Sequence, residues 1–144
     1  MNKVNVKGIL RLRIYRSGVL VEDVTLDNLV TNLGLGQYSK LAAGDPAAVT
    51  IARVGIGEEN TPPQLTDFEL DNPFFKDLSG YVYPANGQVK FSFTIGQLEA
   101  NGMDVQEFGL FDSADTVLFA RRTKPIGIKT ADMEIVGDWT IWFK

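Results

Sequence analysis

From Val4 to Val24, apolar and charged residues alternate on both sides of one turn. The stretch VKGILRLRIYR places apolar residues between basic ones, which is typical of a strand with one buried face. The turn Arg16-Ser17-Gly18 follows, and the apolar pattern resumes in VLVEDVTL. Two such runs around a glycine-containing turn predict a β-hairpin, and we expect its arginines to line one face.

The spacing of apolar residues then changes to three and four positions in the stretch DNLVTNLGLGQYSKLAAGD. This spacing predicts a helix over 28–43, with Asp27 or Asn28 as its N-cap. Gly34 and Gly36 lie inside it, and each weakens a helix by about 1 kcal/mol relative to alanine. We therefore expect either a short, packed helix or a close approach of these glycines to a neighbouring sheet.

Short strands separated by turn signals fill the rest of the chain. VTIARVGIG predicts a buried strand, and ENTPPQLTDFEL after it predicts a long polar loop, because Pro62-Pro63 prevents regular strand pairing. The later predicted strands are LSGYVYP and QVKFSFTI around Asn86-Gly87, one that follows Asn101-Gly102, and TVLFARRT, IKTADMEIVG and DWTIWFK, separated by Pro125 and Gly137. About eight strands and one short helix predict a mainly β chain, an antiparallel β-sandwich formed as a single domain over 1–144.

The stretch VQEFGLFDSADTVLFARR combines the acid pair Asp112 and Asp115 with an arginine pair and raises the question of a chemical site. Asp112 and Asp115 could bind calcium together with Glu107, but a calcium loop gathers more acids in a shorter span. We interpret the stretch as a hairpin. Asp112 is expected to hydrogen-bond the backbone of its own turn, and Asp115 to tolerate the turn conformation, as Asx residues do.

The arginine pair ends the second half of this hairpin. Adjacent strand residues point to opposite faces, so one of Arg121 and Arg122 is expected to face inward or toward an interface. A buried charge without a partner is costly. We therefore expect an acid such as Glu107 or Asp132 to pair with the inward arginine.

The composition closes most routes to catalysis. The chain has neither cysteine nor histidine, which excludes Ser-His-Asp triads, Cys-His pairs and the usual zinc sites. The run Val54-Gly55-Ile56-Gly57 begins like a phosphate-binding loop, but two glutamates follow it where a helix N-terminus would be needed. We expect no catalytic, metal or cofactor site.

Charge and hydropathy also narrow the possible partners. The net charge of −4 argues against a broad nucleic-acid-binding surface. Basic residues interrupt the first 16 positions, so no apolar run is long enough for a signal peptide core or a spanning helix. We expect a soluble protein made in the cytoplasm, with no nucleic-acid or membrane partner.

Aromatic residues provide the remaining candidates for ligand contact. Trp139 and Trp142 are three residues apart and therefore lie on opposite faces of a strand, so at most one can join a surface platform and one is expected in the core. Together with Tyr81 and Tyr83 they are the plausible contacts of a carbohydrate-binding module. Aromatic strand residues more often pack in a core, so this function is the less favoured alternative.

Three motifs, in this order, carry a resemblance to a known group of proteins. They are VGIG with TPP and LTD in residues 54–67, EFGLFD at 107–112 and LFAR at 118–121. Over roughly 27–144 the chain resembles tailed-bacteriophage virion proteins of the tail-fibre, tail-collar and baseplate group. The resemblance implies a structural subunit of the virion, made in the host cytoplasm, which joins neighbouring tail proteins or fibres.

The lack of catalytic residues and the expected strand edges agree with a role in assembly, since neighbours can complete such edges. We expect a symmetric homo-oligomer, a trimer or hexamer, in contact with other phage tail or capsid proteins. A head decoration, or cement, protein of the capsid is the alternative. The residues expected at interfaces are Pro62, Pro63, Leu65, Phe68, Phe74, Phe75, Arg121 and Arg122.

Overall fold

Nine antiparallel strands form one continuous, curled sheet in the computed structural model, which describes residues 5–144. Their order across the sheet is β4-β3-β7-β8-β2-β1-β9-β6-β5. The strands are β1 (Val6–Arg16), β2 (Val19–Val30), β3 (Arg53–Gly57), β4 (Phe74–Asp77), β5 (Gly80–Val82), β6 (Gln88–Ile95), β7 (Asp104–Phe111), β8 (Leu118–Ile128) and β9 (Met133–Phe143). The mainly β, antiparallel fold is thus confirmed.

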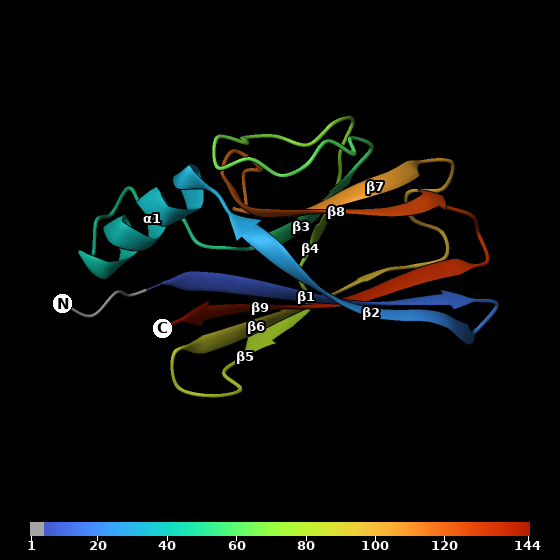
Figure 1. Cartoon of the computed structure of the whole chain (residues 1–144), viewed down its shortest axis with the longest axis horizontal. Coiled ribbons are helices and arrows are strands. Elements are labelled where there is room, and N and C mark those ends of the chain that lie inside the picture. The colour runs from blue at the N-terminus through green and yellow to red at the C-terminus, as the bar shows by residue number, and fades with distance from the viewer. Residues whose placement is uncertain (1–4) are drawn as a thin grey trace.

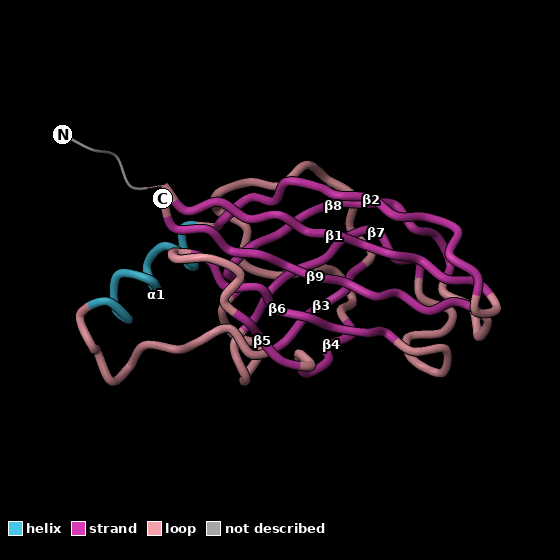
Figure 2. Tube along the Cα trace, turned by 90° about the horizontal axis from the view of Figure 1, so that it is seen from below, coloured by secondary structure: helices cyan, strands magenta, loops and turns pink. Residues whose placement is uncertain are grey.

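The curl brings the two halves of the sheet face to face as a sandwich (Figure 1). Strand β2 belongs to both layers. It pairs with β1 over most of its length, whereas Leu29 and Val30 at its end pair with β8. The lower layer in Figure 1 holds β1, β9, β6 and β5, and the upper layer holds β8, β7, β3 and β4; Figure 2 shows the lower layer from outside.

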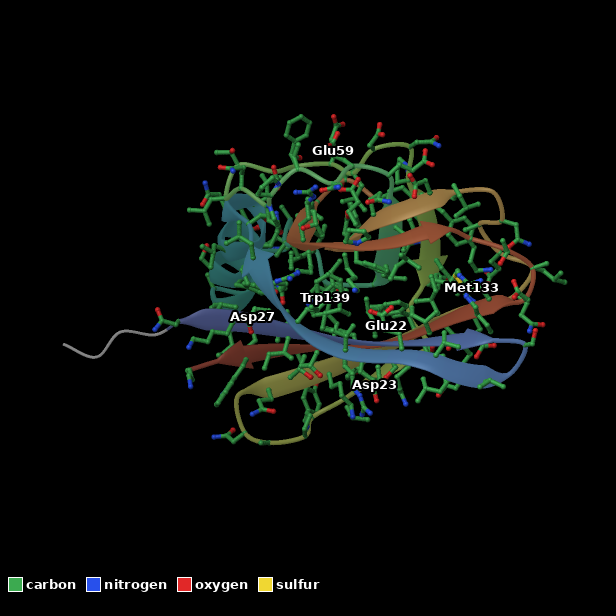
Figure 3. All side chains as sticks on the ribbon, turned by 45° about the vertical axis from the view of Figure 1, so that its right-hand side comes forward. Glu22, Asp23, Asp27, Glu59, Met133 and Trp139 are labelled. Atoms are coloured by element: carbon green, nitrogen blue, oxygen red, sulfur yellow. The ribbon has the colours of Figure 1, made fainter. Side chains whose placement is uncertain are left out.

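The core lies between these layers and is built from the alternate residues of each strand. Leu10, Leu12 and Ile14 of β1 are buried, while the basic residues between them point outward, as the alternation predicts. Trp139 of β9 is completely buried and lies between the layers in Figure 3. The predicted first hairpin is confirmed over the described residues, which do not include Val4.

The helix is shorter than predicted. Helix α1 spans Asn32–Ala42, and Thr31 is its N-cap, with its hydroxyl accepting a hydrogen bond from the Gly34 N–H at 3.0 Å. Asp27 and Asn28 are not caps, because the chain is still in β2 at these positions. Pairing with β1 and then with β8 extends the strand, so tertiary contacts override the local helical spacing.

Three strand predictions also need correction. The buried strand begins at Arg53 rather than at residue 49, and the short strand β4 was not predicted. Gly137 does not separate two strands, because β9 passes through it and the ring of Phe93 occupies the space that a side chain there would need. Pro125 lies inside β8, where the register with β7 is irregular.

Candidate interaction site

Residues 58–73, named here the covering loop, connect β3 to β4 and lie over the outer face of the upper layer (Figure 1). The loop is acidic: it contains Glu58, Glu59, Asp67, Glu69 and Asp71, and no lysine or arginine occurs between residues 54 and 75. The two prolines prevent regular pairing, as predicted, and the loop has no strand of its own. It must therefore be held by contacts other than a ladder of strand hydrogen bonds.

A buried ion pair beneath the loop supplies these contacts. Arg121 of β8 is 2% exposed and Glu107 of β7 is completely buried. The Arg121 Nε–H donates to Oε1 of Glu107 at 2.9 Å. This confirms the expected pairing of the inward arginine with Glu107, while the other candidate, Asp132, lies 3.9 Å from Arg16 instead.

The same ion pair fastens both ends of the covering loop. Arg121 Nη1 donates to the Thr61 carbonyl and to Oδ2 of Asp67, each at 3.0 Å. Oε2 of Glu107 accepts from the backbone N–H groups of Glu59 and Asp71, at 2.8 and 2.9 Å. The two charges are thus satisfied by one another and by the loop, which is the condition under which buried ions are tolerated.

The outer side of the covering loop exposes apolar side chains. Phe68 is 62% exposed and Leu65 is 50% exposed, and Pro62 is also exposed. Pro63 is half-buried. Phe68 directly follows Asp67, which is hydrogen-bonded to Arg121. The segment that presents the Phe68 ring to solvent is therefore fixed to the sheet.

The remaining residues expected at an interface are placed differently. Phe74 and Phe75 lie in β4 rather than in the loop, are partly buried, and pack against the two core clusters. Arg122 points away from Arg121, as expected, and its Nη1 donates to the Asp27 carbonyl at 2.9 Å. The structure therefore leaves Pro62, Leu65 and Phe68 exposed on the covering loop and assigns Arg121 to the support beneath the loop.

The acidic turn between β7 and β8 follows the Asx interpretation. Asp112 accepts hydrogen bonds from the N–H groups of Thr116 and Val117 at 2.7 and 2.8 Å. Burial alone would raise the pKa of Asp112, but these hydrogen bonds leave it below its ordinary value. Asp115 has a positive φ of 60° and accepts from Arg53 at 2.9 Å. Both acids are thereby engaged within the turn and its immediate neighbour.

A second surface feature was not foreseen from the sequence. An open cleft of about 400 Å³, named here the aromatic cleft, lies between α1 and the inner faces of β5, β6 and β9. Its lining residues come from six separate segments of the chain, so no local motif marks it. They are Tyr38, Leu41, Thr50, Ile51, Tyr81, Tyr83, Val89, Phe91, Phe119, Ile141 and Phe143.

Tyr38 is the most unusual residue of this cleft. Its ring contacts Phe119 and Phe143, with centroids 5.7 and 5.1 Å apart, and its buried hydroxyl has no hydrogen-bond partner among the described residues. Burial raises the pKa of Tyr38 above its ordinary value, so the phenol keeps its proton and remains a donor. A buried hydrogen-bond donor without a partner is uncommon in a folded protein.

The aromatic residues named as sugar contacts do not form one platform. Trp139 is in the core, and Trp142 lies on the outer face of β9 beneath the ammonium group of Lys144, 3.8 Å from the ring centroid. Tyr81 and Tyr83 remain, 62% and 73% exposed with their rings 5.7 Å apart. The expectation that one tryptophan is core is confirmed.

Within residues 5–144, no group of three or more His, Cys, Asp or Glu side chains is placed to hold a metal ion. In the same part of the chain no helix is long and apolar enough to cross a membrane. Searches against protein-family models, curated proteins and solved structures found no match for this chain.

Proposed function

We propose that this protein is a structural subunit of a bacteriophage virion, a tail, collar or baseplate component that self-assembles and joins neighbouring tail proteins or fibres. The observation that carries the proposal is that the three motifs of the resemblance meet in one structural unit. Residues 54–57 form most of β3, 107–111 end β7 with Asp112 directly after it, and 118–121 begin β8. These strands are neighbours in the sheet, and the rest of the first motif, within residues 61–67, is hydrogen-bonded to β8 through Arg121.

The chemistry of this unit supports a role in assembly rather than in catalysis. Its buried charges, Arg121 and Glu107, are engaged with one another and in fastening the covering loop. The unit also presents two large apolar side chains to solvent among its acids, Leu65 and Phe68, on a loop held against the sheet. Exposed aromatic anchors on a preorganised support are characteristic of protein–protein contact sites.

The test uses phage particles released by the strain that encodes the chain. Particles purified by density gradient are probed with an antibody against the chain, and particles from the same strain with the gene deleted serve as the control. We expect the chain in the particles and gold label on the tail in electron microscopy. Its absence from intact particles contradicts the virion proposal. Label confined to the head contradicts the tail placement and favours the decoration role.

A further inference from the structure

The exposed Phe68 of the covering loop and the aromatic cleft are an apolar ring and an apolar hollow on different parts of the molecule. The loop lies over the outer face of β3, β7 and β8, whereas the cleft opens between α1 and the edge formed by β5 and β6. No residue of the loop lines the cleft. The ring can therefore fill the cleft only between two copies of the chain.

We infer that Phe68 of one copy inserts into the aromatic cleft of a second copy, so that the chain assembles head to tail. The inference rests on the proposed self-assembling role and names the two surfaces that carry it. A cleft of about 400 Å³ is within the range of sites that bury drug-sized ligands, and it accommodates a phenyl ring with its flanking backbone. Its aromatic lining offers the edge and face contacts that such a ring prefers.

Polar groups on the two surfaces are also complementary. Phe68 is flanked by Asp67 and Glu69, and Glu69 is exposed and enters none of the ion pairs formed within residues 5–144. The cleft lining contains no acid to repel these carboxylates. It contains four hydroxyl groups instead, those of Tyr38, Thr50, Tyr81 and Tyr83.

The hydroxyl groups of Tyr81 and Tyr83 are the most accessible of these groups. These side chains are 62% and 73% exposed, so a carboxylate oxygen arriving with Phe68 would accept a hydrogen bond from them, whereas the Tyr38 hydroxyl is buried. Charge-assisted hydrogen bonds of this kind are shorter and stronger than neutral ones. The cleft therefore fits an aromatic side chain next to an acid, which the covering loop provides.

In the proposed contact each copy uses its loop on one neighbour and its cleft on another, so the contact is heterologous. A contact of this type closes into a ring when its rotation divides a full turn, and otherwise continues as a filament. Because each copy uses one loop and one cleft, the contact can be tested by mixing variants. Two variants, each lacking one surface, should be unable to self-associate but able to join one another.

The experiment measures mass in solution by sedimentation or light scattering over a range of concentrations. Phe68→Ser removes the inserted ring, and Tyr81→Glu places at the cleft a negative charge that repels the acidic covering loop. We expect each to raise the concentration of half-association at least about tenfold, the effect of removing a central aromatic anchor. Val19→Ser and Val21→Glu are the matched controls, since these residues are 63% and 54% exposed on the distant β1–β2 hairpin. They should associate like the unmodified chain.

An equimolar mixture of Phe68→Ser and Tyr81→Glu should give a heterodimer of twice the 15.9 kDa chain mass and nothing larger. Unmodified chain that stays monomeric, association that survives Phe68→Ser, or a mixture that stays monomeric overturns the inference. A strictly monomeric chain that is nevertheless found in phage particles would contradict the inference and the proposed self-assembly, but not the proposed place in the virion. Absence from the particles would contradict the proposed function.

Discussion

At the residue scale, one ion pair decides whether the covering loop has a defined place. Arg121 and Glu107 bind one another and both ends of the loop, and neither is accessible to water. The neighbouring Arg122 has similar chemistry but faces the other way and donates to backbone carbonyls. The pair of adjacent arginines therefore provides a matched comparison of a buried and a partly exposed charge.

We predict that Arg121→Ala destabilises the protein by about 3–5 kcal/mol, because it leaves Glu107 buried without a counter-charge. Arg122→Ala should change the free energy of unfolding by no more than about 1 kcal/mol, since a part-exposed arginine and its hydrogen bonds contribute little. Urea unfolding followed by circular dichroism measures both. Equal effects of the two substitutions would show that the Glu107 pairing contributes nothing special.

At the element scale, helix α1 is attached to the sheet by its first turn. The Thr31 N–H donates to the Phe119 carbonyl of β8 at 3.1 Å, and the Thr31 hydroxyl donates to the Leu118 carbonyl. Gly34 follows one turn later, and a Cβ built there would lie 2.4 Å from the Phe119 carbonyl oxygen. A Cβ on Gly36 would meet nothing within 4 Å. The expected close approach of a helical glycine is thus confirmed for Gly34 and wrong for Gly36.

The two glycines should consequently respond to alanine in opposite directions. Gly36→Ala is expected to stabilise the protein by about 0.5–1 kcal/mol, because alanine is the better helix former. Gly34→Ala gains the same propensity but forces α1 away from β8, and we expect a net destabilisation of about 1–3 kcal/mol. Thermal unfolding of the two variants separates the effects, and a stabilised Gly34→Ala would show that the helix docks less closely.

At the scale of the whole molecule, ionised carboxylates tie together segments at different places on the sandwich. Glu99 accepts hydrogen bonds from Lys76 and from the Gly96 N–H, and these, the Lys76 bond above all, lower the pKa of Glu99. Hydrogen bonds from Asn72 and from the Asp104 N–H lower the pKa of Glu58 in the same way. Glu99 thus joins the connection after β6 to Lys76 of β4. Glu58 joins the two ends of the covering loop and links them to the start of β7.

The sign of the pH dependence follows from these shifts. The folded protein holds both carboxyls below their ordinary pKa of 4.5, so the unfolded chain binds more protons in acid. Their stabilisation is complete above pH 4.5 and is lost as the pH falls through the lower folded values. We expect the melting temperature to fall below about pH 4.5.

Glu99→Gln should lower the melting temperature at pH 7 and lose this difference in acid, where the unmodified residue is also neutral. Asp27→Asn, at an exposed position of β2, is the control and should leave the melting temperature unchanged. Scanning calorimetry between pH 3 and pH 7 follows both variants. A difference for Glu99→Gln that is constant with pH would assign its effect to packing rather than to charge.

The sequence alone determined those features that depend on neighbouring residues. Period-two alternation and turn residues predicted the first hairpin and the 105–122 hairpin, and the opposite faces of Arg121 and Arg122 followed from strand geometry. The partner of Arg121, Glu107, was one of the two acids expected from the sequence, because a buried arginine needs a carboxylate to balance its charge.

Only the tertiary structure decided what depends on distant segments. The end of β2 pairs with β8, so the first part of a stretch with helical spacing forms a strand. Gly137 lies within a strand because the ring of Phe93 packs against it, and it is not a strand boundary. The aromatic cleft is assembled from residues between 38 and 143, and no periodicity along the chain encodes it. Local patterns specify which face a side chain takes, whereas packing between layers determines what it meets there.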